Sequence, residues 1–126
     1  MHDETRGLGG AADVLAQAGV AAIAFHPRSA RVQHKGDPDY GLVRELAESV
    51  EVPVIVSGGL SSAAAARHAY EASGADAVMI ARGSFGWPWI FAELTGRRIE
   101  APDRAEIATE LLWLIDRAEE HLGTER

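Results

Sequence analysis

The sequence predicts an α/β fold in which parallel strands alternate with helices. Short apolar runs at residues 20–25, 53–56 and 75–81 alternate with segments whose apolar residues recur at helical spacing. Such alternation with short connections is typical of right-handed crossovers, as in a doubly wound sheet or a (β/α)8 barrel. A whole barrel takes about 250 residues. The 126 residues of this chain therefore suffice for part of a barrel and an added helix.

The composition predicts a soluble globular unit without thiol or metal chemistry. Apolar residues make up 47% of the chain, and there is no cysteine, which excludes disulfides, a cysteine nucleophile and a Cys-based zinc site from these residues. No His/Asp/Glu spacing indicates metal ligands. No apolar run approaches the roughly 20 residues that cross a bilayer. We therefore expect no membrane association and a cytoplasmic location.

The net charge of −7 argues against a general nucleic-acid surface, because such a surface needs basic side chains. One stretch differs from this average. Residues 24–36 contain no acid, but they contain Arg28, Arg31, Lys35 and two histidines. The pattern fits either a solvated loop or a loop that contacts an anion.

The first half of the chain predicts two helices and one strand. Residues 8–18 have helical spacing, although glycines obscure where this helix starts. Residues 20–25 form a run of small apolar residues, typical of a covered strand, that ends at His26. Asp37 and Pro38 then suit an N-cap and a first helical turn. The apolar stripe of the second helix comprises Leu42, Val43, Leu46 and Val50.

The next strand, 53–56, leads into the turn Ser57-Gly58-Gly59. Two adjacent glycines allow a backbone to approach a phosphate or a ring closely. Ser61 or Ser62 caps an alanine-rich helix that ends at Gly74. This turn is therefore the first candidate binding element.

The strand at 75–81 ends in the turn Arg82-Gly83, and Pro88 suits the start of a new helix with Trp89, Ile90 and Leu94 on its apolar face. Ligands of parallel α/β proteins bind beyond the carboxyl ends of strands, where backbone N–H groups can hold a phosphate. The two glycine-bearing turns therefore predict a phosphate site. We interpret the three tryptophans as core or domain-interface residues: Trp87, Trp89 and Trp113.

A linker follows Gly96, and a final helix follows the linker. Asp103 and Glu106 have the spacing of a capping box, and Gly123 suits the end of the helix. One face of this helix is apolar, comprising Ile107, Leu111, Leu114, Ala118 and Leu122.

Three motifs, AIAFHPRSARVQHKG, VPVIVSGGL and GADAVMIARGSFGWPWIF, together resemble the second half of the tRNA-dihydrouridine synthase family over about residues 8–96. The resemblance implies that residues 1–96 are the C-terminal half of a (β/α)8 TIM barrel that binds FMN, with three parallel strands. Residues 97–126 would be a linker and the first helix of a helical tRNA-binding domain. It also implies that NADPH reduces the flavin, which then passes hydride to uracil in tRNA and reduces its 5,6 double bond.

The resemblance assigns roles to individual residues. The turns Ser57-Gly58-Gly59 and Ala81-Arg82-Gly83 match the family's phosphate-binding turns after the seventh and eighth strands, usually Asn-Gly-Asp and Gly-Arg. Ser57, Gly59 and Ala81 change side-chain contacts there but keep most backbone donors. His26 matches a histidine near the pyrimidine edge of the flavin, and it could instead cap its strand. The loop toward the substrate uridine would contain Arg28, Gln33, His34 and Lys35, of which the last three could equally be solvent-facing.

The family's catalytic cysteine and flavin-contacting lysine belong to the first half of the barrel, so we expect no catalytic residue here. We expect a fragment that is inactive alone, binds FMN weakly or not at all, and pairs with itself or with a missing N-terminal half through an open strand edge. Two alternatives remain. One is another phosphate-binding barrel enzyme, such as a sugar-phosphate isomerase or cyclase. The other is a non-catalytic, self-assembling half-barrel.

Overall fold

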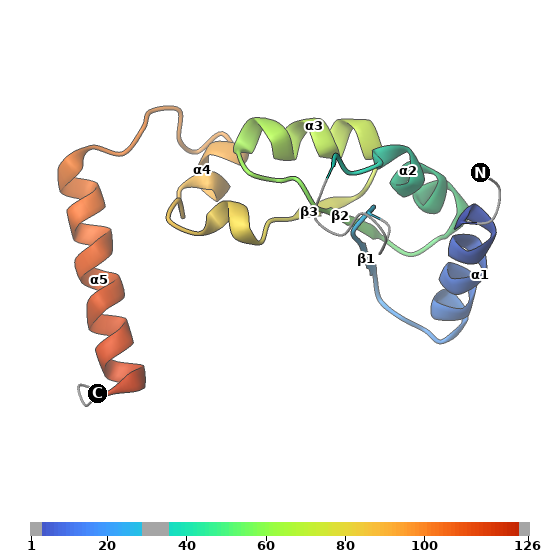
Figure 1. Ribbon diagram of the computed structural model, residues 1–126, viewed down its shortest axis with the longest axis horizontal. Helices are drawn as coiled ribbons and strands as arrows, with labels where there is room; N and C mark the ends of the chain where they lie inside the picture. Colours follow the sequence, from blue (N-terminus) through green and yellow to red (C-terminus); the bar gives the residue numbers. More distant parts are fainter. Residues whose placement is uncertain (1–3, 29–35, 124–126) are drawn as a thin grey trace.

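The computed structural model describes residues 4–28 and 36–123, and it alternates strands with helices as predicted (Figure 1). In these ranges we find no helix with both the length and the apolar character that crossing a bilayer requires. The elements in chain order are α1 (Glu4–Gln17), β1 (Ile23–Phe25), α2 (Tyr40–Ser49), β2 (Val54–Ser57), α3 (Ala63–Ser73), β3 (Ala77–Met79), the 3-10 helix η1 (Arg82–Ser84), α4 (Ile90–Leu94) and α5 (Arg104–Leu122).

The three strands form one parallel sheet in the order β1-β2-β3, which confirms the predicted fold class. Asp76 fixes the register of β2 against β3 at the amino ends of the strands. Its backbone N–H donates to the Val54 carbonyl at 2.8 Å, and its carboxylate accepts from the Val54 N–H at 2.8 Å. The carboxyl ends of β2 and β3 consequently lie level, with Ser57 beside Met79.

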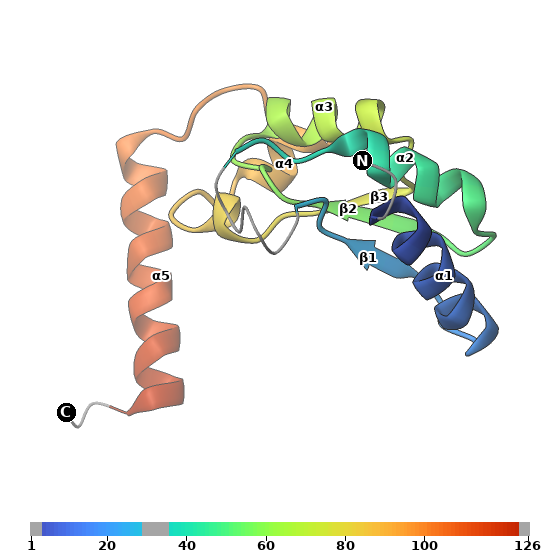
Figure 2. The ribbon, with the colours of Figure 1, turned by 45° about the vertical axis from the view of Figure 1, so that its right-hand side comes forward.

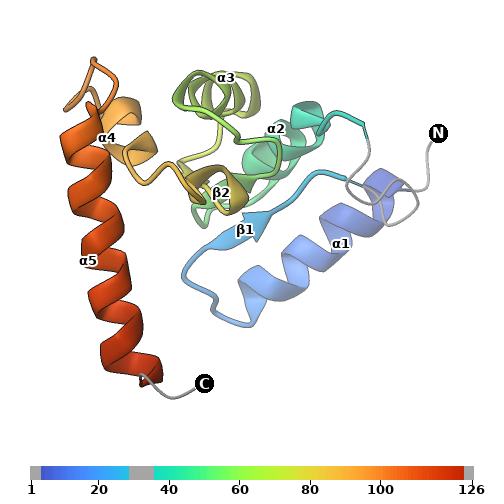
Figure 3. The ribbon, with the colours of Figure 1, turned by 60° about the vertical axis from the view of Figure 1, so that its left-hand side comes forward.

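Helices α2 and α3 lie side by side against the sheet, and α1 lies next to α2 (Figures 1 and 3). The core lies between these helices and the strands, where Val43, Val54, Val56 and Ala66 are fully buried. Alternate strand positions point the other way, as the two-residue period of a strand requires. On that face Ala24 and Ala77 are exposed, and Met79 is 46% exposed. One apolar face of the sheet is therefore uncovered within the described residues.

Two helix starts differ from the predictions. Helix α1 begins at Glu4, ahead of its glycines, because glycine inside a helix costs only about 1 kcal/mol and does not forbid one. Helix α2 is capped by Asp39, whose carboxylate accepts from the Gly41 N–H at 3.0 Å, and the predicted cap Asp37 was wrong. The reason is tertiary: the Asp39 N–H donates to the carbonyl of buried Pro27, which places the cap two residues later.

The caps of α3 and α5 match the predictions. Ser62 accepts from the Ala65 N–H at 3.1 Å, and Gly74 ends α3 with a left-handed φ of 63°. Asp103 and Glu106 form the predicted capping box of α5. Helix α4 is shorter than predicted, since it begins at Ile90 with Trp89 as its N-cap, two residues after Pro88.

Helix α5 stands apart from the rest of the molecule, beyond a long connection from α4 (Figures 1 and 2). None of its residues is buried in the described structure, and the side chains of its apolar stripe are exposed except for Ile107, which is half-buried. Trp113 is also 53% exposed, so the described residues do not bury it as a core residue. The division into units at 1–96 and 97–126 stays a prediction.

Candidate functional site

A cavity of about 590 Å³ lies at the carboxyl ends of the strands, where β1, β2 and β3 run into their following turns. It brings together all seven residues that the sequence predicted for cofactor binding: His26, Ser57, Gly58, Gly59, Ala81, Arg82 and Gly83. The other residues that line it, which sequence reasoning missed, are Leu60, Ser61, Met79, Phe85 and Trp87. The two predicted turns are thus parts of one concave site.

Gly83 allows the two turns to touch. A Cβ atom at Gly83 would collide with the backbone carbonyl of Leu60, which follows the first turn. The neighbour is backbone, so it has little freedom to move aside. The absence of a side chain at this position is therefore what permits the observed spacing of the two turns.

Gly58 and Gly59 are held in conformations that other residues rarely adopt, with φ of 98° and 73°. A Cβ at Gly58 would lie 2.8 Å from Nε2 of His26. At Gly59 it would lie 3.0 Å from the Pro38 ring and 3.1 Å from the Tyr40 hydroxyl. The turn after β2 is therefore enclosed on one side by His26 and on the other by the start of α2.

The charges around the cavity favour an anion. Arg82 and His26 line it, and none of the described residues that line it is acidic. This contrasts with the chain as a whole, which has 19 acidic residues against 12 basic ones. The Arg82 side chain is exposed, and in residues 4–28 and 36–123 its guanidinium has neither a carboxylate nor a carbonyl partner.

Arg28 lies beside His26 and does not line the cavity. Its Nη1 is 3.3 Å from Nε2 of His26, and its Nε donates to the Gly36 carbonyl at 3.2 Å. Because a guanidinium has no acceptor, Nε2 of His26 accepts this hydrogen bond, which puts the proton of a neutral ring on Nδ1. The other predicted substrate residues, Gln33, His34 and Lys35, lie outside the described residues.

Two further residues support the cavity without having been predicted to do so. The Tyr40 hydroxyl donates to the Gly58 carbonyl at 2.9 Å, and its ring packs edge-on against His68. Burial raises the pKa of Tyr40, the nearby Arg28 charge lowers it and Asp37 raises it, with a net upward shift. Trp87 lines the cavity, and its indole N–H donates to Glu93 at 2.9 Å. Its interpretation as a core or domain-interface residue stays a prediction.

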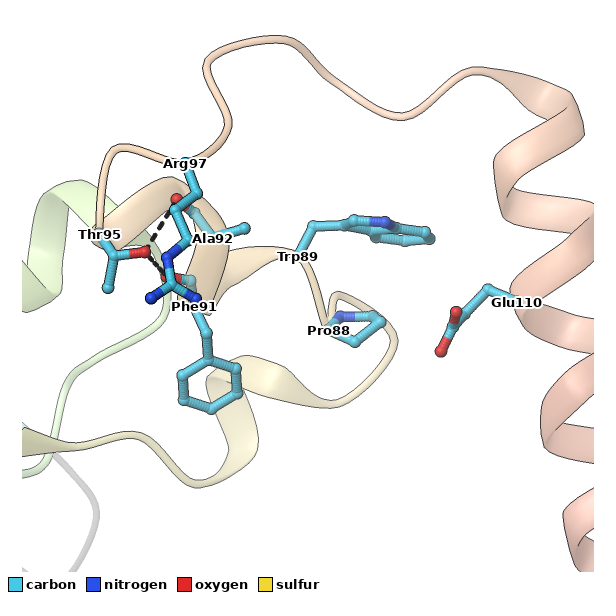
Figure 4. A pocket seen from close by; sticks show the side chains of 7 residues that line it. All are labelled: Pro88, Trp89, Phe91, Ala92, Thr95, Arg97 and Glu110. Atoms are coloured by element: carbon cyan, nitrogen blue, oxygen red, sulfur yellow. Dashed lines mark hydrogen bonds between the residues drawn. The ribbon is translucent and has the colours of Figure 1, made fainter.

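A second cavity, of about 460 Å³, lies between the α4 region and α5 (Figure 4). Trp89 and Pro88 face Glu110 of α5 across it, and the Thr95 hydroxyl donates to the carbonyls of Phe91 at 2.9 Å and Ala92 at 3.3 Å. It contains none of the predicted site residues. Across the described ranges, histidine and acidic side chains form no group of three or more suited to a metal ion.

Comparison with known proteins gives a consistent result. The model of the family described as dihydrouridine synthase (Dus) matches residues 1–124. A probable tRNA-dihydrouridine synthase of Rickettsia conorii is 34% identical over 109 residues, which cover 82% of this chain and 33% of the relative. The tRNA-dihydrouridine synthase B of Pseudomonas syringae pv. tomato is 35% identical over 106 residues, covering 80% of this chain and 32% of the relative. The chain spans about a third of the length of these curated relatives.

Proposed function

This chain belongs to the dihydrouridine synthase family, and we propose that it supplies the phosphate-binding end of an FMN site to an enzyme that reduces uridine to dihydrouridine in tRNA. The observation that carries the proposal is the acid-free cavity in which Arg82 and two glycine-bearing turns meet. A phosphate monoester carries close to two negative charges near neutral pH. An arginine with backbone N–H donors suits it, whereas a carboxylate would repel it.

The residues present fit the phosphate end of this cofactor. Gly83 lets the turn after β3 close against Leu60, and Gly58 lets the turn after β2 lie against the His26 ring. Arg82 would pair with the phosphate, and Ser57 and Ser61 bring hydroxyls to the same cavity. His26 lines the same cavity and would lie beside the ring system of the flavin.

The bound flavin would supply hydride to one carbon of the uracil 5,6 double bond. NADPH would be its reductant, and a protein acid outside this chain would provide the proton for the other carbon. In this chain Arg28 would orient His26 through the contact between Nη1 and Nε2. Gln33, His34 and Lys35 would reach toward the uridine and its phosphates. We also propose that the whole protein acts on tRNA in the cytoplasm.

The first test measures flavin binding by this chain at the phosphate end. We expect Arg82→Gln to weaken FMN binding by about tenfold, the loss of one charge-assisted hydrogen bond or ion pair, and to leave riboflavin, which lacks the phosphate, unaffected. Arg104→Gln is the matched control, since Arg104 lies at the start of α5 and does not line the cavity. Equal binding of FMN by the Arg82 variant and the unsubstituted chain would contradict the proposal.

The second test concerns the whole reaction. We expect this chain alone to form no dihydrouridine in unmodified tRNA. In a chimera in which it replaces the matching segment of the Rickettsia conorii relative, we expect NADPH-dependent dihydrouridine formation, measured by mass spectrometry of the digested tRNA. A chimera that folds and binds flavin but reduces no uridine would count against the proposed reaction.

One observation favours a second candidate, a self-assembling module. The uncovered sheet face and the open apolar stripe of α5 are surfaces that other protein surfaces commonly cover. In this reading the chain would pair with a second copy or with an N-terminal half-barrel. Sedimentation of the chain alone separates these states, as described below.

A further inference from the structure

Tyr40 contacts the predicted phosphate site from behind. It is the first residue of α2, and it is not among the residues that line the cavity. Its hydroxyl nevertheless donates to the Gly58 carbonyl at 2.9 Å, and Gly58 and Gly59 both line the cavity. The hydrogen bond therefore holds the peptide unit between the two glycines from the side away from the cavity.

The hydrogen bond from Tyr40 also determines the direction of the Gly59 N–H. No peptide bond in the described residues is cis. In a planar trans peptide the carbonyl of one residue and the N–H of the next point in opposite directions. Since the Gly58 carbonyl points to Tyr40, the Gly59 N–H points away from Tyr40, toward the side on which the cavity lies.

We propose that Tyr40 is a positioning residue that fixes the Gly58–Gly59 peptide so that the Gly59 N–H donates to an anionic group in the cavity, a phosphate in the first instance. This inference deepens the proposed function and rests on it for the identity of the phosphate. Glycine needs this support more than other residues do, because φ values of 98° and 73° are only two of the many that it can adopt. Without the hydroxyl, the peptide can rotate and present its carbonyl oxygen to the anion.

The surroundings keep Tyr40 in its donor form. Burial is the largest cause that raises the pKa of its hydroxyl, so the proton is retained at neutral pH. The ring makes an edge-on contact with His68, with 6.1 Å between ring centroids, and both Pro38 and the Tyr40 hydroxyl lie next to Gly59. A phenylalanine would fill the same space and lose only the hydrogen bond.

The test compares Tyr40→Phe with Tyr70→Phe, its matched control. Tyr70 is 47% exposed on α3, and its hydroxyl makes no hydrogen bond in the described part of the chain. Binding of inorganic phosphate, FMN and riboflavin is measured for each full chain, and the Gly59 amide resonance is followed during the phosphate titration. For Tyr40→Phe we expect about tenfold weaker binding of phosphate and FMN, the loss of one hydrogen bond to a charged group. Riboflavin binding should be unchanged.

The outcomes separate this inference from the proposed function. A Gly59 amide that phosphate shifts in the unsubstituted chain and in Tyr70→Phe, but not in Tyr40→Phe, supports it. An unmoved Gly59 amide in the unsubstituted chain, or equal weakening of FMN and riboflavin in Tyr40→Phe, overturns it. If phosphate shifts the amide and Tyr40 controls that shift, while FMN binds neither to this chain nor to the chimera with the Rickettsia conorii relative, the flavin proposal fails and the positioning role stands.

Discussion

The close approach of Gly83 to Leu60 depends on the absence of a side chain at residue 83. The carbonyl of Leu60 occupies the position that a Cβ at residue 83 would need, so the turns after β2 and β3 approach each other only because residue 83 is glycine. The cavity that carries the proposed function lies where these turns meet. A methyl group at residue 83 would therefore force the turns after β2 and β3 apart.

We expect Gly83→Ala to lower the free energy of unfolding by about 1–3 kcal/mol, the usual cost of overpacking a closed site. Gly10→Ala is the control, because no atom lies within 4 Å of the Cβ that it adds in α1. That variant should stabilise the chain by about 0.5–1 kcal/mol, since alanine loses less conformational entropy in a helix. Urea denaturation of both variants measures the difference, and an unchanged or raised stability for Gly83→Ala would contradict the packing argument.

The residues of the cavity were predictable where their position along a strand decides their place in space. Ser57 ends β2 and Arg82 closely follows β3, so the parallel topology alone brings them to the same end of the sheet. Tyr40 was not predictable, because it acts from the start of a helix on a turn 18 residues away in sequence. Met79 and Phe85 are large apolar residues of the kind that usually form a core, and only the structure shows that they border a cavity.

At the scale of elements, the N-terminus of α5 depends on a cluster of hydrogen bonds around Glu106. Arg98 donates to both carboxylate oxygens at 2.8 Å, and the backbone N–H of Asp103 donates to the same group at 3.2 Å. The Arg98 hydrogen bonds are the largest cause that lowers the pKa of Glu106, from 4.5 to about 2. Arg98 also lies 5.9 Å from the centre of the Trp89 ring, which connects the start of α5 to the end of the preceding unit.

This arrangement predicts a pH dependence of α5. Because the pKa of Glu106 is lower in the folded chain, its contribution to stability is complete above pH 4.5 and is lost as the pH falls through about 2. Titration of the Glu106 carboxyl by NMR measures the pKa directly. Arg98→Gln should raise it toward 4.5, whereas Arg97→Gln, the neighbouring arginine without this contact, should leave it unchanged.

Glu106 is exposed and Arg98 is half-buried, so salt should reduce the difference between the two variants. An unchanged Glu106 titration in Arg98→Gln would show that the backbone hydrogen bonds alone lower the pKa.

The existence of each strand and each α-helix was predictable, whereas the 3-10 helix η1 and several boundaries were not. The stripe that includes Val43 and Leu46 identifies α2, because burial of one helix face requires that spacing. Its cap was misassigned because Asp37 and Asp39 are chemically equivalent, and a contact with Pro27 chooses between them. The apolar stripe of α5 was equally clear in the sequence. The spacing of its residues alone, however, does not identify the surface that covers the stripe.

For the whole molecule, the uncovered surfaces predict self-association. Strands β1 and β3 are both edges of the described sheet, and the open face between them includes Ala77 and Met79. We expect the isolated chain to sediment as oligomers at micromolar concentration and to bind a hydrophobic dye. Leu111→Lys on α5 and Ala77→Lys on the sheet should show which surface drives association. A stable monomer without dye binding in the unsubstituted chain would contradict this prediction.

The pairing of Asp76 with Val54 has a consequence at the other end of the sheet. Val54 and Ser57 are the first and last residues of β2, separated by roughly 10 Å of strand. A shift of β3 by one residue relative to β2 would break both hydrogen bonds. It would also leave the Asp76 carboxylate without its hydrogen-bond partner at the amino end of the sheet. The position of Arg82 relative to Ser57 is therefore set by these two hydrogen bonds at the amino ends of the strands. The proposed binding end of the sheet is therefore aligned by residues at the opposite end of the same strands.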